Sequence, residues 1–222
     1  MDTSVMRLRD RAQLFRAFAR EVASALAPLG FVRDTGQLFA SPMSEQVFAV
    51  LGLNKAIEAD RVEVNPVMGL RHVAIESLID EALRLPDLAK HAMTMGASLG
   101  YLMPDPRYRP VLITNEDDTK QEASDLALDV ERFGLPFVRK HKELTAIARA
   151  VQTPPLNAEH RRIYTLPAAY FLVGDYPAAQ AFLEEHLKEL AGKNYPAAKQ
   201  FRRFAQALLT RLSTPRPGGR DT

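Results

Sequence analysis

Five polar residues, in two stretches of the chain, are the candidates for a functional site. They are Asn65, Arg71, His72, Tyr101 and Arg107. Asn65 stands before Pro66, and Arg71 and His72 stand before a helical pattern. We therefore expect these three to present polar groups at the end of a strand, where rigid structure often holds recognition residues on a loop. An ordinary polar loop between a strand and a helix is the alternative.

The spacing of the polar residues matches no catalytic or cofactor-binding motif that we considered. The chain has no cysteine, which excludes disulfides, thiolate metal sites and cysteine nucleophiles. Glycine-rich phosphate loops are absent. The five histidines form neither a His-x-x-x-His nor a Glu-x-x-His pair on one helix face, and they are His72, His91, His141, His160 and His186. We predict no catalytic residues, no metal and no cofactor.

An acidic run is the one pattern that invites a metal, because hard cations bind several oxygen ligands. Its carboxylates are Glu116, Asp117, Asp118, Glu122, Asp125 and Asp129. No Asp-x-Asp-x-Asp-Gly loop is present to wrap an ion. Helical spacing places the last three acids away from the apolar stripe, so we expect water to solvate them and the helix dipole to favour the acids near its start.

Composition places the chain among ordinary globular proteins. Of 222 residues, 46% are hydrophobic and 25% charged, and the formal net charge is +2. No secretory apolar segment and no run of about 18 apolar residues occurs, so we expect a cytoplasmic protein that does not enter a membrane. Arg202, Arg203 and Arg211 lie on the wet side of the last helical pattern, and no aromatic-basic strand accompanies them, so nucleic acid is an unlikely partner.

The first half of the chain predicts a helix followed by antiparallel strands. Apolar spacing indicates a helix over residues 11–29, which Gly30 ends. Asp34-Thr35-Gly36-Gln37 then predicts a hairpin turn between residues 31–33 and 38–40. Further strands are predicted over 46–53 and 61–65, which makes a meander of three or four strands packed on the helix.

The rest of the chain is mostly helical in pattern. A helix is predicted over 72–85, residues 87–100 fit a helix or a strand, and 101–103 and 111–114 are expected to extend the sheet. Helices follow from Lys120, with a break at Gly134-Leu135-Pro136 and a linker at Thr153-Pro154-Pro155. We predict an α+β domain over 1–153, a C-terminal helical subdomain over 154–213, and a disordered tail over 214–222.

One helical hairpin loosely resembles a tetratricopeptide repeat, with Gly174-Asp175-Tyr176 as its turn. A solenoid needs about three copies to bury its faces. The nearest echo, Asn194-Tyr195-Pro196, begins about 19 residues later rather than at the repeat's spacing of roughly 34. A helical packing layer is therefore the favoured interpretation, and a peptide-binding array is the alternative.

The order of elements resembles a known family. Leu29-Gly30-Phe31, a polar turn, Leu38-Phe39, a strand ending Gly52-Leu53-Asn54, then Val62-Glu63-Val64-Asn65 and Val67-Met68-Gly69 are similar to a bacterial domain of unknown function, type forty-three-zero-four. The resemblance covers roughly residues 14–151 and includes Gly134-Leu135-Pro136-Phe137. Here Pro66 follows Asn65 and the glycine comes only at Gly69, which departs from the family's spacing. Similar small α+β proteins include immunity proteins that neutralise toxins by surface binding.

Two functions remain open at this point. The first is a cytoplasmic, non-catalytic binding protein of the immunity kind whose partner is another protein. The second is a small enzyme in which Asn65, Arg71, His72, Tyr101 and Arg107 converge on one pocket only in the folded chain.

Overall fold

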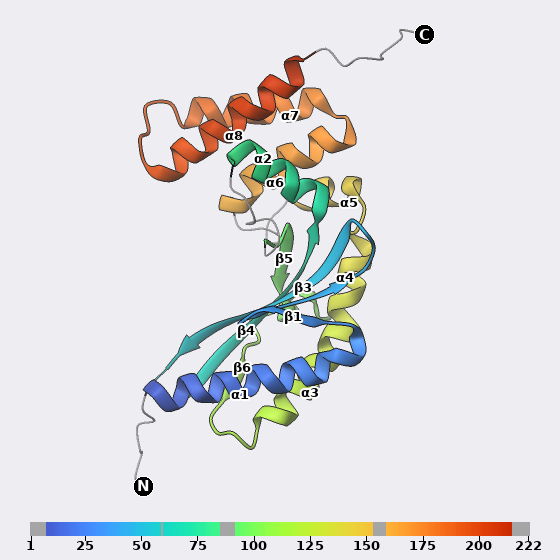
Figure 1. Cartoon of the computed structure of the whole chain (residues 1–222), viewed down its shortest axis with the longest axis vertical. Coiled ribbons are helices and arrows are strands. Elements are labelled where there is room, and N and C mark those ends of the chain that lie inside the picture. Colours follow the sequence, from blue (N-terminus) through green and yellow to red (C-terminus); the bar gives the residue numbers. More distant parts are fainter. Residues whose placement is uncertain (1–7, 59, 85–91, 153–158, 215–222) are drawn as a thin grey trace. The chain divides into compact units, whose positions relative to one another are not determined.

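The chain is described by a computed structural model over residues 8–58, 60–84, 92–152 and 159–214 (Figure 1). It divides into two compact units. Unit 1 comprises Met1–His72 and Met93–Lys142, and unit 2 comprises Val73–Ala92 and Glu143–Thr222. The predicted linker at 153–155 and the predicted tail from residue 215 onward lie outside the described residues.

Unit 1 is built on a six-stranded antiparallel sheet, which confirms the predicted α+β class. The strands are β1 (Val32–Thr35), β2 (Leu38–Pro42), β3 (Val47–Ile57), β4 (Val62–His72), β5 (Met95–Ser98) and β6 (Val111–Ile113). Their order is β1-β2-β3-β4-β5, and β6 pairs with β4 as well. The predicted meander therefore forms, and two short strands extend it beyond β4.

Strand β4 runs through Pro66, which corrects the expectation that a strand ends at Asn65. Residues 62–64 pair with β6 and residues 67–70 pair with β5. Pro66 lies between these paired segments, where the missing N–H of proline costs a sheet least. Asn65, Arg71 and His72 are consequently strand residues and not loop residues.

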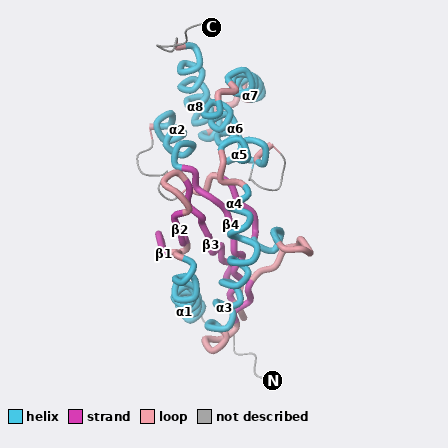
Figure 2. Tube along the Cα trace, turned by 90° about the vertical axis from the view of Figure 1, so that its right-hand side faces the viewer, coloured by secondary structure: helices cyan, strands magenta, loops and turns pink. Residues whose placement is uncertain are grey.

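Helices cover one face of this sheet. They are α1 (Leu8–Leu26), α3 (Thr119–Asp129) and α4 (Leu135–Lys140), with a 3-10 turn at Ala27–Leu29 and a π-helical turn at Val130–Gly134 between α3 and α4. Figures 1 and 2 show α1 and α3 side by side against the strands. The even-numbered residues of β4 are buried on this covered face, and Phe18 and Phe39 are fully buried with them. We call the opposite side the outer face.

The junction from the first helix into the sheet follows the predicted pattern. Gly30 adopts φ +79° and its N–H donates to the carbonyl of Ala27 at 3.0 Å, a left-handed cap that glycine adopts readily. Phe31 and Phe39 are buried on either side of the hairpin. The turn itself is tighter than predicted, because β1 extends to Thr35 and β2 begins at Leu38.

Residues 87–100, which fit a helix or a strand in the sequence, contain a strand in their described part. Met95–Ser98 is a strand, whereas Leu99–Leu102 is a 3-10 helix and not the sheet extension expected at 101–103. The chain then leaves the sheet and returns at β6. We call residues 99–110 the excursion.

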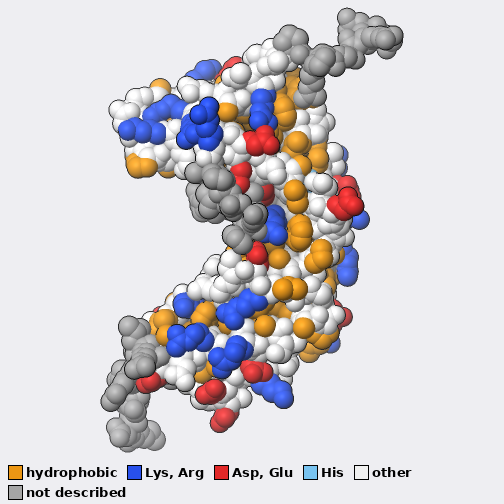
Figure 3. Space-filling model, in the orientation of Figure 1, with side chains coloured by type: hydrophobic (Ala, Val, Ile, Leu, Met, Phe, Trp, Pro, Cys, Tyr) orange, Lys and Arg blue, Asp and Glu red, His pale blue; other side chains and the backbone are white. Residues whose placement is uncertain are grey.

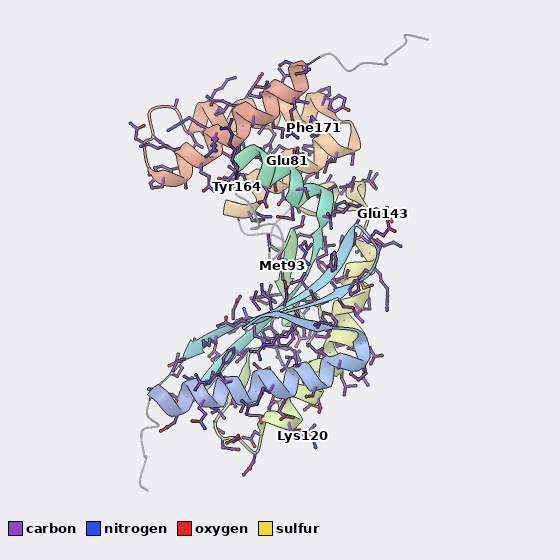
Figure 4. All side chains as sticks on the ribbon, in the orientation of Figure 1. Glu81, Met93, Lys120, Glu143, Tyr164 and Phe171 are labelled. Atoms are coloured by element: carbon purple, nitrogen blue, oxygen red, sulfur yellow. The ribbon has the colours of Figure 1, made fainter. Side chains whose placement is uncertain are left out.

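In its described residues, unit 2 contains helices and no strand. The helices are α2 (Val73–Leu83), α5 (Leu144–Ala150), α6 (Glu159–Val173), α7 (Tyr176–Glu189) and α8 (Pro196–Ser213). Its core includes the rings of Phe201 and Phe204, which pack edge-on against Tyr164 of α6 at 5.9 and 5.1 Å between centroids. Tyr164 is labelled in Figure 4. None of the described helices has the length and apolar character needed to cross a bilayer.

The boundary between the units does not fall at residue 153. Helix α2 lies between two strands of unit 1 in sequence, yet it packs against α6 and α8, and α5 packs against α6. Buried contacts, including an ion pair between Glu76 of α2 and Arg161 of α6, join α2 to the helical unit. The helical unit therefore draws on two separate segments of the chain.

Candidate binding surface

The five predicted site residues lie in different surroundings. Asn65 and Arg71 have odd numbers in β4 and face the outer side of the sheet, six residues and roughly 20 Å apart along the strand. His72 points to the covered side and is buried. Tyr101 and Arg107 belong to the excursion. Thus Asn65, Tyr101 and Arg107 lie toward the β6 end of β4, and Arg71 and His72 lie at its other end.

Arg71 is held by the hairpin that opens the sheet. Its guanidinium lies over the ring of Phe48, 4.6 Å from the centroid, and is 3.5 Å from the carboxylate of Asp34. Only 12% of the Arg71 side chain is exposed. This arginine of β4 thus contacts β3 and β1, and its charge is already paired.

Three half-exposed apolar side chains gather at the other end of β4. Tyr101 and Tyr108 are 45% and 49% exposed, and Leu112 of β6 is 46% exposed. Tyr108 donates a hydrogen bond to Glu63 of β4, and Leu112 is the cross-strand neighbour of the same glutamate. We call Tyr101, Tyr108 and Leu112 the tyrosine patch. Among the described residues only six large apolar side chains are this exposed, so half of them belong to one segment of twelve residues.

Polar contacts hold the patch in place. The Tyr108 hydroxyl lies 2.6 Å from Oε1 of Glu63, and this hydrogen bond, with partial burial and the negative charge of Glu63, raises the pKa of Tyr108. Below it, Nδ2 of Asn65 donates to Oγ of Ser98 at 3.0 Å. Tyr108 is therefore a neutral hydrogen-bond donor at physiological pH and not a nucleophile.

A narrow neck closes the excursion. The N–H of Arg107 donates to the carbonyl of Gly100 at 3.3 Å, and Arg109 binds the carboxylate of Asp105 at 3.1 Å. A Cβ on Gly100 would lie 2.4 Å from the carbonyl oxygen of Arg107 and 2.9 Å from Cβ of Arg109. Glycine is thus required at position 100, because the two arms of the excursion touch there.

A small pocket lies beside the neck, where β4 has neither β5 nor β6 as a neighbour. Its volume is about 170 Å³. Apolar walls come from Pro66, Leu99, Met103, Val111 and Leu126, and the charged groups are Arg109 of the excursion and Glu122, Asp125 and Asp129 of α3. We call it the carboxylate pocket. Lys120, labelled in Figure 4, marks the first turn of the helix that supplies the acids.

Burial changes the acidity of two of these carboxylates. Desolvation is the largest cause that raises the pKa of Glu122, and the charges of Asp125 and Asp118 add to it. Desolvation and then Asp125 raise the pKa of Asp129, although Arg109 and Arg132 oppose the change. Glu122 and Asp129 are half-buried and Asp125 is exposed, so the expected solvation of these acids is reduced at Glu122 and Asp129.

The charges of unit 1 are separated between two neighbouring helices. On the face drawn in Figure 3, Lys and Arg side chains gather over α1, where Arg16 and Arg20 are exposed. The acids of α3 lie on the helix that packs beside it. A cationic group approaching unit 1 is consequently favoured on the α3 side.

A serine motif that the sequence analysis overlooked has no catalytic geometry. Gly96-Ala97-Ser98-Leu99-Gly100 matches the Gly-x-Ser-x-Gly pattern, in which a strained strand-to-helix turn exposes a nucleophilic serine. Ser98 instead has φ −55° and ψ 133°, an unstrained extended backbone, and its Oγ accepts the hydrogen bond from Asn65. Ser98 thus anchors Asn65.

Two pockets of unit 1, the carboxylate pocket and a more open hollow, do not bring the candidates together. No group of three or more His, Cys, Asp or Glu side chains among the described residues could hold a metal ion. The carboxylate pocket is not lined by any of the five predicted residues, and neither is a second, more open hollow between Ala25, Leu29 and Leu128. Of the five candidates, Tyr101 and Arg107 both lie in the excursion.

Comparison with known proteins adds no relative. No protein-family model, curated protein or solved structure matches this chain. The resemblance to the bacterial domain of unknown function accordingly stays a prediction.

Proposed function

We propose that this chain is a non-catalytic binding protein whose partner is another protein and whose contact surface is the tyrosine patch. The observation that carries the proposal is the gathering of Tyr101, Tyr108 and Leu112, each about half exposed, on one short segment. Exposed apolar side chains that lie together indicate an interaction site, whereas single ones are ordinary.

The residue types of the patch suit a protein interface. Tyrosine and arginine are enriched among the residues that dominate binding energy, and Arg107 is 65% exposed next to Tyr108. The charges next to the patch are paired, since Asp105 lies within ion-pair distance of both Arg107 and Arg109. The surface is therefore apolar and aromatic at its centre with a paired polar rim, as interfaces between proteins are.

The patch is also ordered before any partner arrives. The hydrogen bond from Tyr108 to Glu63 and the neck at Gly100 fix the excursion at two points. A surface that is fixed in advance loses little conformational entropy on binding. Toxin neutralisation by surface contact, in the cytoplasm of a bacterium, is the form of this function that the sequence resemblance suggests.

Site-specific cross-linking tests the proposal. A photo-reactive amino acid replaces Tyr108 in one sample and Tyr195 in another, and both proteins are irradiated in the native cell. Tyr195 is a matched control because it is 50% exposed and stands directly before α8 in unit 2, as the N-cap residue of that helix. We expect one stoichiometric protein adduct from position 108 and none from position 195. Equal labelling at the two positions, or no adduct at position 108, contradicts the proposal.

The captured partner is then purified and titrated with the intact chain. Tyr108→Ala removes a central aromatic contact, so we expect a loss of roughly 2 kcal/mol, or about 30-fold in affinity. Tyr195→Ala is expected to leave the affinity unchanged.

A further inference from the structure

We infer that the partner adds an extended segment to the open edge of β6, so that hydrogen bonds between the two backbones hold the partner beside the tyrosine patch. The inference rests on the proposed function, because it names the form that the partner takes at that same surface.

The hairpin between β3 and β4 fixes the direction of the backbone groups of β4. The N–H of Glu58 donates to the carbonyl of Arg61 at 3.0 Å. Backbone groups alternate sides along a strand, so the odd-numbered residues of β4 direct theirs toward β3 and the even-numbered ones direct theirs toward β6. The even-numbered residues that pair with β6 are in register with Val111 and Ile113, which therefore bond β4.

Leu112 is left with its N–H and C=O directed away from β4. The two groups of a trans peptide unit point in opposite directions, so the C=O of Pro110 and the N–H of Thr114 also face this open edge. No hydrogen bond joins any of these backbone groups to another described residue. The edge thus presents an acceptor, a donor, an acceptor and a donor in a row, which is the pattern that an extended chain pairs with.

Other open edges of the sheet carry features that oppose strand addition. Strand β1 has the charged residues Arg33 and Asp34, and its register shifts beside them. The end of β3 that β2 does not reach carries Lys55. Charges and bulges of this kind protect sheet edges from pairing with other chains. Strand β6 has no charged residue, and its Leu112 is 46% exposed.

An added segment would also contact the tyrosine patch. Residues that lie directly opposite on neighbouring strands project from the same face of a sheet. The partner residue opposite Leu112 therefore projects on the outer face, where Tyr108 bonds Glu63. We expect this residue to be apolar, with every second N–H of the segment directed at β6. A partner helix fits the edge poorly, because its backbone groups are already bonded within the helix.

Amide hydrogen exchange of the full chain, labelled with ¹⁵N, tests the edge directly. In the free chain we expect the amides of Leu112 and Thr114 to exchange at least tenfold faster than those of Val111 and Ile113. Equal protection at the four positions would overturn the inference, because the edge would already be paired. When the partner captured at position 108 is bound, we expect exchange at Leu112 to slow at least tenfold.

Two substitutions at position 112 separate the backbone from the side chain. Leu112→Ala removes the apolar side chain and keeps the outward N–H. Leu112→Pro also removes that N–H, costs no bond to β4, and places proline at an edge strand, where it is tolerated. We expect the proline variant to bind the partner at least tenfold more weakly than the alanine variant, and thermal melts check that both are folded. Equal binding of two folded variants would refute strand addition.

The partner's own segment separates this inference from the proposed function. A peptide that covers the cross-linked segment is made with one N-methyl group at each successive position. If binding falls at least tenfold at alternate positions only, both stand. If the partner cross-links at position 108 but the losses do not alternate and Leu112 stays unprotected, strand addition is refuted and the proposed function stands. If position 108 gives no adduct, or gives an adduct only with a second copy of this chain, both fall.

Discussion

The ion pair between Glu76 and Arg161 offers the most informative test of how unit 2 is held together. The Glu76 side chain is 2% exposed and that of Arg161 is 23% exposed. Breaking a buried pair by removing one partner costs about 3–5 kcal/mol, because the other charge stays behind in a poor solvent. Glu76→Ala leaves a guanidinium that still reaches water, so we expect the lower end, about 3 kcal/mol.

The reverse substitution is expected to cost more. Arg161→Met takes the Arg161 cation away from a glutamate side chain that is only 2% exposed, so we expect the upper end of that range, about 5 kcal/mol. Replacing both residues, Glu76→Leu with Arg161→Met, should return stability to within about 1–2 kcal/mol of the original.

Thermal and urea unfolding followed by far-ultraviolet circular dichroism measure these differences. Unit 2 has about 100 residues, so a loss of 3 kcal/mol lowers its Tm by roughly 12–24 °C. Arg211→Ala is the matched control. Arg211 of α8 pairs at 2.7 Å with Glu81 of α2, the helix that also carries Glu76, but both side chains of this pair are well exposed. It should cost less than about 1 kcal/mol. Single variants of the buried pair that unfold like the Arg211 variant would refute the reasoning.

Three further predictions concern the excursion, the acids of α3 and a helix cap. Gly100→Ala should destabilise unit 1 by about 1–3 kcal/mol and weaken partner binding, because its Cβ meets the Arg107 carbonyl, whereas Gly36→Ala, with no atom within 4 Å, should not; thermal melts with both variants decide this. Since burial raises the pKa of Glu122 and Asp129, the folded state holds these protons more tightly, so unit 1 should lose stability as pH rises from about 4 toward neutrality. Melts of the Glu122→Gln, Asp129→Asn variant should show a flatter pH profile, and an unchanged profile would contradict the assignment. Asp175→Ala should cost about 1 kcal/mol in urea unfolding, because its side chain accepts the N–H of Ala178 at the start of α7, and Asp117→Ala should cost measurably less.

Local patterns predicted the elements whose sequence periodicity is strong. The helix ended by Gly30, the hairpin after it and the helix after His72 all appear where apolar spacing and turn residues indicate them. Local sequence patterns do not show which strands pair with one another when the strands are far apart in the chain. Strand β4 continues through Pro66, which is in register with Leu53 of β3 and lies between the segments of β4 that pair with β5 and β6. Strands β5 and β6 are too short to show alternation.

The candidate surface was predicted in part for the same reason. Tyr101 and Arg107 were candidates from the sequence, but Tyr108 and Leu112 were not, because their place beside Glu63 depends on the pairing of β6 with β4. Glu122 and Asp129 looked solvated because helical spacing sets them apart from the apolar stripe. Both are half-buried in the fold, where they line a pocket together with residues of the excursion.

Cross-linking from position 108, with position 195 as its control, tests the central claim most directly. The account predicts a single protein adduct from position 108 in the native cell, no adduct from position 195, and about 30-fold weaker binding of that purified partner by Tyr108→Ala. An adduct formed equally from both positions, or a partner that binds Tyr108→Ala as tightly as the original chain, would contradict it.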